Sequence, residues 1–290
     1  MNKKIAITTD SSSAILPEEC TGTNLFLLPM PFLINGECYF ENVNLTQNAF
    51  YEKLAAGADV STSQPSVGEL TDFWTEILRS YDEIVHIPLS SGLSQACASA
   101  TILAKEFNGK VHVVNNRRVS VTLKQSVLDA LKLAEQGRSA TEIKAYLEES
   151  AGDSSIYIAV DTMKFLKKGG RVTPAAAMIG TILKIKPVLQ IHGDKLDKYA
   201  LARGNAKAKD AMKTAMKKDV ETKFAKFVEN GEFALYIAHS ANEAEAIAFK
   251  AEIQALFPNI PVTFCDPLSP VISCHIGPGS LAVAASRFVK

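Results

Sequence analysis

Hydroxyl side chains gather at one turn of this chain, between a predicted strand and a predicted helix. Residues 84–87 are apolar enough for a short buried strand, and the run that starts at Leu93 has Ala, Ile and Leu at helical spacing. A helix starting there leaves its first N–H groups unpaired and points its positive dipole end at the turn. Gly92 lets a ligand approach the backbone closely, and hydroxyl donors come from Ser90, Ser91 and Ser94. The turn is typical of an anion site, and an empty serine-capped turn fits the same residues.

The same segment approximates the nucleophile elbow of a serine hydrolase. Residues 92–96 have the sequence GLSQA, and Asp266 and His275 follow in the chain order Ser, Asp, His that such enzymes use. The second glycine of the elbow is an alanine here, and no HG-type oxyanion loop precedes the segment. A hydrolase of acyl esters with Ser94 as nucleophile is therefore the alternative function.

Nucleotide and metal sites of the usual kinds are not indicated. The sequence contains neither G-x-x-x-x-G-K-[ST] nor G-x-G-x-x-G, and the basic, glycine-rich run 167–171 fits the positively charged end of a helix. The five histidines lack ligand spacing and no H-E-x-x-H occurs, so we expect no metal. His275 differs from the other four because Gly277, Pro278 and Gly279 constrain the backbone beside it.

Composition indicates a soluble globular protein with a sizeable core. The chain has 290 residues, 47% of them hydrophobic and 21% charged, and its 31 basic residues balance 31 acidic ones. This balance argues against binding to nucleic acid or to an acidic membrane surface. No signal peptide or membrane span is indicated, and five scattered cysteines without a C-x-x-C pair favour the reduced cytoplasm. No heptad pattern occurs, so we expect a monomer.

The first half of the chain alternates predicted strands with predicted helices. Asp10 and the serines at 11–13 follow the first strand as a second polar turn, and Asn35-Gly36 predicts a hairpin. Serine with glutamate three residues later predicts helix starts at Ser66 and Ser139. This order predicts an α/β fold with a parallel sheet and helices on both faces. Strands are expected at residues 4–8, 84–87, 111–114 and 156–160, and helices at residues 47–56 and 119–136.

The pattern changes after Asp161, which predicts a second α/β domain. Thr173 and Pro174 open a short helix, and Ser240 with Glu243 predicts the start of another that runs to Phe257. Further elements are a hairpin of residues 187–191 and 196–201, a helix at residues 206–227, and strands at residues 233–238 and 262–265. The simplest partition is a domain of residues 1–154 and a domain of residues 155–290.

Seven motifs, in order along nearly the whole chain, resemble the DegV family of bacterial fatty-acid-binding proteins. They are TTDSSSAI near the start, TSQPS from Thr62, IPLSSGLS, DTMKFLKKGGRV from Asp161, IKPVL, ALARG and HIGPGS from His275. The resemblance implies a two-domain α/β protein that holds one long-chain fatty acid in an apolar tunnel between the domains. It also implies that a separate ATP-dependent kinase subunit converts the carboxyl group to an acyl-phosphate for phospholipid synthesis, so that this protein is not itself the catalyst and needs no cofactor.

The resemblance also assigns roles to particular residues. Thr62 and Ser94 match the positions whose hydroxyls bind the carboxyl group, and His275 matches a histidine of the same hydrogen-bond network. Arg171 matches a basic residue near that end of the site. Arg203 matches an exposed arginine that is implicated in the function of the carrier with the kinase. A carboxylate only accepts hydrogen bonds, so such donors suit it. Ser91 and Gly92 are further candidates for head-group contacts.

Two stretches depart from the family pattern. After SSGLS, the usual residues of the family are replaced by Gln95, Ala96 and Cys97. A glycine-containing run of the family is replaced by NNRRVSVTLKQS, which starts at Asn115. Either change could alter which acyl chain is accepted. A ligand-sensing interaction protein with no enzymatic partner is therefore a third hypothesis, after the carrier and the hydrolase.

Overall fold

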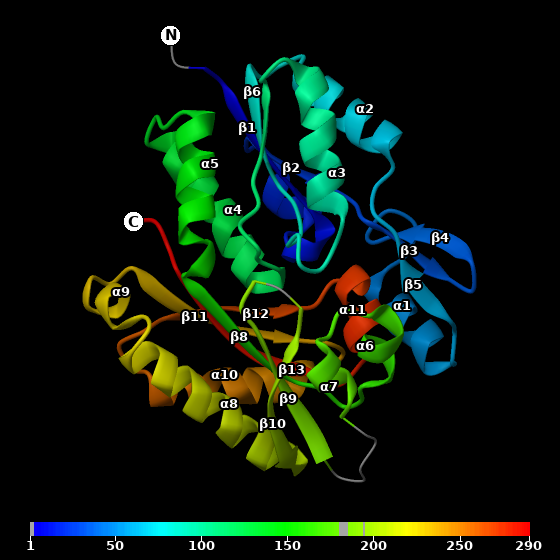
Figure 1. Ribbon diagram of the computed structural model, residues 1–290, viewed down its shortest axis with the longest axis vertical. Coiled ribbons are helices and arrows are strands. Elements are labelled where there is room, and N and C mark those ends of the chain that lie inside the picture. The colour runs from blue at the N-terminus through cyan, green and yellow to red at the C-terminus, as the bar shows by residue number, and fades with distance from the viewer. Residues whose placement is uncertain (1–2, 180–184, 194) are drawn as a thin grey trace. The chain divides into compact units, whose positions relative to one another are not determined.

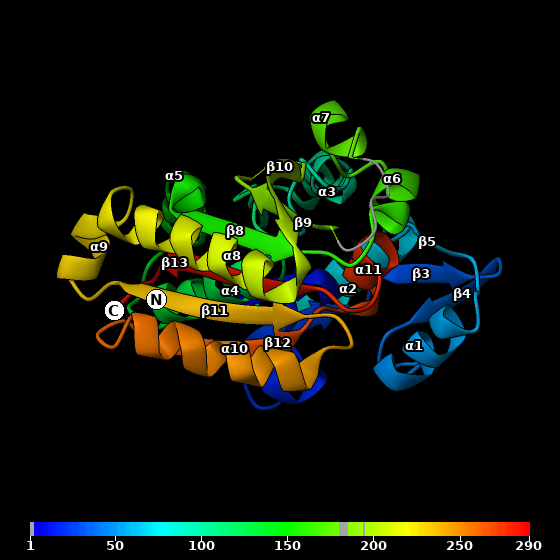
Figure 2. The same ribbon diagram turned by 90° about the horizontal axis from the view of Figure 1, so that it is seen from below.

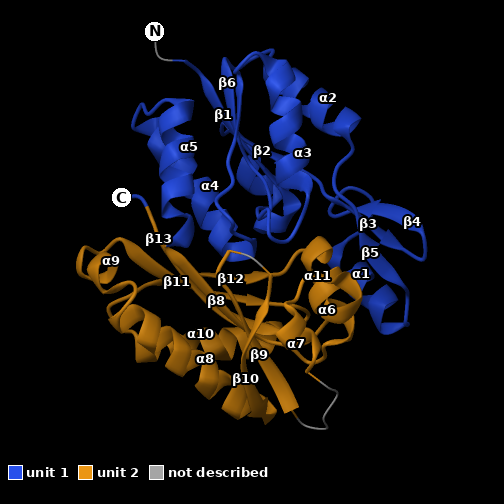
Figure 3. Cartoon of the chain, viewed as in Figure 1, with its two compact units in different colours: residues 1–152, 289–290 blue, residues 153–288 orange. Residues whose placement is uncertain are grey.

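The chain forms two compact units, each with its own sheet. The computed structural model describes residues 3–179, 185–193 and 195–290. One unit comprises residues 1–152 with 289–290, and the other comprises residues 153–288 (Figure 3). The division expected from the sequence lies after residue 154 and leaves the last two residues in the second domain.

The first unit is built on a four-stranded parallel sheet in the order β2-β1-β6-β7 (Figure 1). Parallel neighbours require crossover connections, which helices supply here. The predicted parallel sheet is confirmed. Its strands are β1 (Ile5–Asp10), β2 (Leu25–Leu28), β6 (Glu83–Ile87) and β7 (Val111–Val113).

Helices cover both faces of this sheet. Successive residues of a strand point to opposite faces, so Ile7 packs in one core with Leu123, whereas Ala6 packs in another with Trp74. The capping boxes predicted at Ser66 and Ser139 both form. The helices are α4 (Ser120–Glu135) and α5 (Ala140–Glu149) on the first face, and α2 (Val67–Ile77) and α3 (Ala96–Leu103) on the second.

A smaller antiparallel sheet, in the order β4-β3-β5, completes the first unit together with α1 (Gln47–Ala55). Asn35 and Gly36 both have positive φ, 52° and 87°, which confirms the predicted hairpin turn. Part of the polar segment before Ser66 pairs with β3 as a strand. The strands are β3 (Pro31–Ile34), β4 (Glu37–Phe40) and β5 (Val60–Thr62).

The second unit has a six-stranded sheet in the order β10-β9-β8-β13-β11-β12. All its neighbours are antiparallel except β11 and β12, which are parallel. The predicted hairpin of β9 and β10 is confirmed. The strands are β8 (Ser154–Ala159), β9 (Ile185–Ile191), β10 (Asp197–Arg203), β11 (Phe233–His239), β12 (Val262–Pro267) and β13 (Leu281–Arg287).

Two long helices, α8 (Gly204–Glu221) and α10 (Glu243–Leu256), run alongside these strands (Figure 2). They bury Met212 and Phe249 against strand residues such as Leu235 and Val283. The helix expected over residues 206–227 is therefore two helices, because α8 ends at Glu221 and α9 (Ala225–Glu229) follows it. The remaining short helices are α6 (Lys164–Gly169), α7 (Pro174–Ala177) and α11 (Pro270–Ile276).

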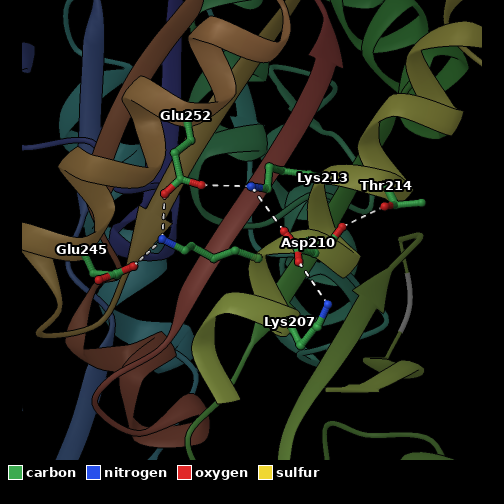
Figure 4. A network of polar contacts seen from close by, with 7 residues as sticks. Lys207, Asp210, Lys213, Thr214, Glu245 and Glu252 are labelled. Carbon is green, nitrogen blue, oxygen red and sulfur yellow. Dashed lines mark hydrogen bonds and ion pairs between the residues drawn. The ribbon is translucent and has the colours of Figure 1, made fainter. Parts of the chain in front are cut away.

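Ion pairs join α8 to α10 on the outside of the second unit. Lys209 Nζ lies 2.7 Å from a carboxylate oxygen of Glu245 and 2.7 Å from one of Glu252, and Lys213 Nζ lies 3.0 Å from Glu252 (Figure 4). Lys209 and Glu252 each take part in two of these pairs, so the pairs form a network instead of isolated contacts.

Another expectation about the second unit was wrong. Ser240 does not cap α10, whose N-cap is Asn242; the Ser240 hydroxyl instead donates to the carbonyl of Gly277 at 2.6 Å. The strand expected at residues 262–265 forms as β12, and a further strand, β13, follows it and pairs with both β8 and β11. Its residues, LAVAASR, are small enough for a strand covered on both faces, a composition that also suits a helix.

Candidate functional site

Asp10 joins two polar turns at the carboxyl ends of β1 and β6. These strands are parallel neighbours, with Thr9 paired to Ile87, so the turns that follow them lie side by side. One Asp10 carboxyl oxygen accepts from the Ser12 N–H at 2.9 Å and from the Ser12 hydroxyl, and the other accepts from the Leu89 N–H at 2.8 Å. Burial raises the pKa of Asp10, and these hydrogen bonds oppose that shift. The buried carboxyl therefore fixes the path of the Ser90–Ser94 turn.

The backbone donors of that turn are largely used within it. The N–H groups of Leu93 and Ser94 donate to the Ser90 carbonyl, each at 3.0 Å, and the Gly92 N–H donates to the Ser90 hydroxyl at 3.2 Å. The helix α3 begins at Ala96, three residues later than the sequence indicated. The expectation that unpaired N–H groups at Leu93 face the turn is therefore wrong, and side-chain hydroxyls become the main donors.

Ser94 presents such a hydroxyl at the start of α3. Its oxygen accepts from the Ala96 N–H at 3.1 Å, and the side chain is half-buried. A hydroxyl has one proton to donate in addition to its acceptor positions. In the described part of the chain the Ser94 hydroxyl donates to no protein group, so its proton can go to a ligand. Ser91 lies exposed in the same turn.

The loop that carries Thr62 lies against the same helix. Thr62 is the last residue of β5, pairs with Phe32 and is half-buried. Two residues later, the Gln64 side-chain oxygen accepts from the Ser99 hydroxyl of α3 at 3.2 Å. The structure thus brings the segments of Thr62 and Ser94 to one side of the first unit, as their predicted shared role requires.

In the second unit, His275 packs directly on Gly169. His275 lies near the C-terminal end of α11, and Gly169 is the last residue of α6. A Cβ atom built on Gly169 would lie 2.2 Å from Nδ1 of His275, so no other residue fits there without displacement. A Cβ atom on Gly277 would likewise lie 2.4 Å from the ring of Phe165. The glycines of both motifs therefore allow α6 and α11 to pack closely.

Arg171 is the charged group next to His275. It is half-buried, and its guanidinium donates to the Gly169 carbonyl. Burial lowers the pKa of His275 to about 4, and the positive charge of Arg171 contributes to the shift. His275 is therefore neutral near pH 7, with one ring nitrogen a donor and the other an acceptor, and Arg171 supplies the positive charge.

Arg203 is the last residue of the edge strand β10. It is exposed and pairs in register with Ile185. Within residues 3–179, 185–193 and 195–290, its side chain forms no hydrogen bond or ion pair. A guanidinium of this kind is available to another molecule.

The arrangement does not favour a serine hydrolase. A nucleophile elbow places its serine on a strained backbone, but Ser94 is absent from the described residues with positive φ. Asp266 influences a different histidine: burial lowers the pKa of His239, and Glu243 and Asp266 oppose that shift. Among the described residues, the shift of the His275 pKa comes from burial and from Arg171, whereas a carboxylate assists the histidine of a Ser-His-Asp triad.

Two residues that organise the site were not singled out from the sequence. Asp10 was seen only as part of a polar turn, and Gly169 only as part of a helix end. The roles of both residues depend on contacts with motifs far apart in the chain. No rule of sequence spacing connects such motifs. Among the described residues, no group of three His, Cys, Asp or Glu side chains is placed to hold a metal, and no helix is long and apolar enough to cross a membrane.

Comparison with family models identifies one match over nearly the whole chain. The model described as "Uncharacterised protein, DegV family COG1307" matches residues 4–287. A DegV domain-containing protein of Deinococcus radiodurans is 31% identical over 285 residues, which cover 97% of each chain. A second, from Staphylococcus aureus, is 27% identical over 291 residues and covers 99% of this chain and 100% of its own.

Solved structures with the same fold include proteins described as binding fatty acids. A fatty-acid-binding DegV family protein from Thermus thermophilus has a TM-score of 0.87 at 29% identity and covers 98% of this chain and 100% of its own. DegV from Bacillus subtilis, described as a fatty acid binding protein, has a TM-score of 0.82 at 27% identity, with 98% and 99% covered.

Proposed function

Since this chain belongs to the DegV family, we propose that it binds a long-chain fatty acid and holds it by the carboxyl group. The observation that carries the proposal is the Ser94 hydroxyl, whose oxygen is fixed by the Ala96 N–H while its proton has no acceptor in the described chain. A hydroxyl fixed in this way is suited to a group that only accepts hydrogen bonds, as a carboxylate does.

Four side chains serve the carboxyl group in this proposal. Thr62 and Ser94 donate hydroxyl protons, and His275 and Arg171 contribute a neutral ring donor and a positive charge. Hydrogen bonds to a charged group contribute about 1.5–3 kcal/mol each. Burial of the acyl chain adds about 0.8 kcal/mol per methylene, which exceeds the head-group terms for a long chain. The tail therefore supplies most of the affinity, and the polar groups set its orientation.

The carrier presents the carboxyl group to an ATP-dependent kinase subunit, which forms the acyl-phosphate in the cytoplasm. Support for a partner comes from Arg203, an exposed guanidinium on an edge strand with no partner in the described chain. The catalytic groups belong to the kinase in this proposal, since the carrier itself needs only to bind and orient.

Extraction of the bound lipid tests the proposal directly. Freshly purified protein is denatured, and the extract is analysed by mass spectrometry before and after incubation of the native protein with mixed fatty acids. We expect a near-stoichiometric fatty acid whose retention falls in a Thr62→Ala, Ser94→Ala variant. Ser63→Ala is the matched control, because Ser63 is an exposed neighbour whose hydroxyl donates to the Gln64 carbonyl. A protein that takes up no fatty acid in either experiment contradicts the proposal.

A further inference from the structure

The first unit contains a pocket of about 450 Å³ that none of the proposed carboxyl-binding residues lines. This volume lies within the range of small-molecule sites. The pocket borders β2, the outer strand of the parallel sheet. Its apolar walls include Ile15, Leu25, Phe26, Leu27, Val43 and Phe73.

Among the described residues that line this pocket, Glu41 is the only acidic one, and none is Lys, Arg or His. Its side chain is half-buried, and in the part of the chain that the structure describes the carboxyl makes no hydrogen bond or ion pair. Burial raises the pKa of Glu41 to about 8, since no positive charge compensates for lost hydration. A cation that enters the pocket would stabilise the ionised form of this carboxyl group.

The surroundings of the pocket add negative charge. Cys20, which also lines it, has its pKa raised by burial and then by the charges of Glu19 and Glu18 on the short helix η2 (Pro17–Cys20). Lys124 of α4 is the nearby cation, and it is paired with Glu19 at 3.0 Å. On α2, the residue next to Phe73 is Asp72, which is exposed. An anion such as a fatty acid carboxylate would meet no positive partner here.

We propose that this pocket binds a small organic ammonium ion with an aromatic or branched apolar group. The ammonium group pairs with the Glu41 carboxylate, and the apolar group packs on the walls. Phe26 and Phe73 offer aromatic rings, which attract a cation at their faces. The inference is independent of the fatty-acid site, because it uses no residue of that site and favours the opposite charge.

Phenethylammonium, phenethyl alcohol and phenylpropionate form a probe series that tests the proposal by isothermal titration calorimetry. The three share an aromatic group and carry a positive charge, no charge and a negative charge. In protein preloaded with a fatty acid, we expect phenethylammonium to bind more tightly than the alcohol and phenylpropionate to bind least. Binding of the amine should release a proton, because a Glu41 that is protonated at pH 7 must ionise to pair with it. Buffers that differ in ionisation enthalpy detect that proton.

The pH dependence gives a quantitative expectation. With the pKa of Glu41 at about 8, its ionised fraction rises from about a tenth at pH 7 to about nine tenths at pH 9. An alkylammonium stays charged over most of this range, because its pKa resembles that of the lysine side chain, about 10. Affinity for the amine should therefore rise about tenfold, while affinity for the alcohol should not rise.

Glu41→Gln keeps the size of the side chain and removes its charge. It should abolish both the preference for the amine and its pH dependence, while leaving binding of the alcohol unchanged. Phe73→Leu should lower the affinity for the amine and for the alcohol to a similar extent. Ser94→Ala should change none of these affinities. Equal affinities for amine and alcohol in the wild-type protein, an amine preference that survives Glu41→Gln, or no saturable binding by any probe would each overturn the proposal.

Discussion

Gly169 and His275 are in direct contact although 106 positions separate them in the chain, and the contact leaves no space for a Cβ atom on Gly169. A side chain there would come within 2.2 Å of Nδ1 of His275, far inside van der Waals contact. The position of the His275 ring therefore depends on the absence of a side chain at the end of α6.

Gly169→Ala should displace the His275 ring and weaken fatty-acid binding about tenfold or more, with a cost of about 1–3 kcal/mol in the free energy of unfolding. The measurements are displacement of a fluorescent fatty acid and denaturant unfolding. Gly68→Ala is the control, because Gly68 also lies in a helix and a Cβ there meets only the Ser66 hydroxyl, at 4.0 Å. Equal fatty-acid affinity in the two variants would contradict a role for His275 in ligand binding.

Ser94→Ala should lower fatty-acid affinity by about ten- to a hundredfold, the effect of losing one hydrogen bond to a charged acceptor. It also removes the acceptor for the Ala96 N–H, which should cost about 1 kcal/mol of stability. Ser94→Thr retains the hydroxyl and should recover most of the fatty-acid affinity and most of the stability. The same variant tests the hydrolase: a fluorophosphonate probe that labels wild-type protein but not Ser94→Ala would revive that alternative.

Stability should fall as the pH drops from about 6.5 towards 5, because the buried His86 and the half-buried His275 resist protonation. Burial lowers the pKa of His86 to about 3, and burial with Arg171 lowers that of His275 to about 4. Below the unfolded pKa of about 6.5, protons bind the unfolded chain preferentially, so stability present above that pH is lost. Each histidine contributes a slope of at most about 1.4 kcal/mol per pH unit. His275→Gln should show a shallower pH dependence in chemical denaturation than the wild-type protein.

Removing the cation at the centre of the α8–α10 network should destabilise the second unit modestly. Lys209→Met keeps the length of the side chain but leaves Glu245 without that partner, and Glu252 with Lys213 only. We expect a loss of about 1 kcal/mol, which shrinks in high salt as partly exposed charges are screened. Lys217→Met is the control, because Lys217 pairs only with Glu221, at 3.7 Å on the same helix. A salt-independent difference between the variants would argue against an electrostatic origin.

Arg203→Ala should reduce acyl-phosphate formation by the kinase about tenfold or more and leave fatty-acid affinity within about twofold, because its side chain is exposed and forms no hydrogen bond or ion pair within the described chain. The assay combines ATP, the kinase subunit and lipid-loaded carrier, with binding measured separately. Lys217→Ala controls for loss of one exposed positive charge. Loss of lipid binding in Arg203→Ala would place this residue in the ligand site instead.

Local sequence rules determined much of the secondary structure. Capping boxes at Ser66 and Ser139 and the Asn35-Gly36 turn formed as predicted, because each depends on groups within a few residues. The parallel sheet of the first unit was also predictable, since strand and helix patterns alternate. The ordered motifs, including Thr62, Ser94 and His275, were sufficient to identify the family.

Tertiary structure decided what depends on distant partners. The LAVAASR segment became the strand β13 because β8 and β11 supply hydrogen bonds on both sides, although alanine favours helices. Ser240 lost its predicted capping role because the Gly277 carbonyl lies close enough to accept its proton. Asp10 reaches the Leu89 N–H only because β1 and β6 are neighbours in the sheet. The sequence alone determined which groups the turns carry, and packing between distant segments determined which of those groups remain available to a ligand.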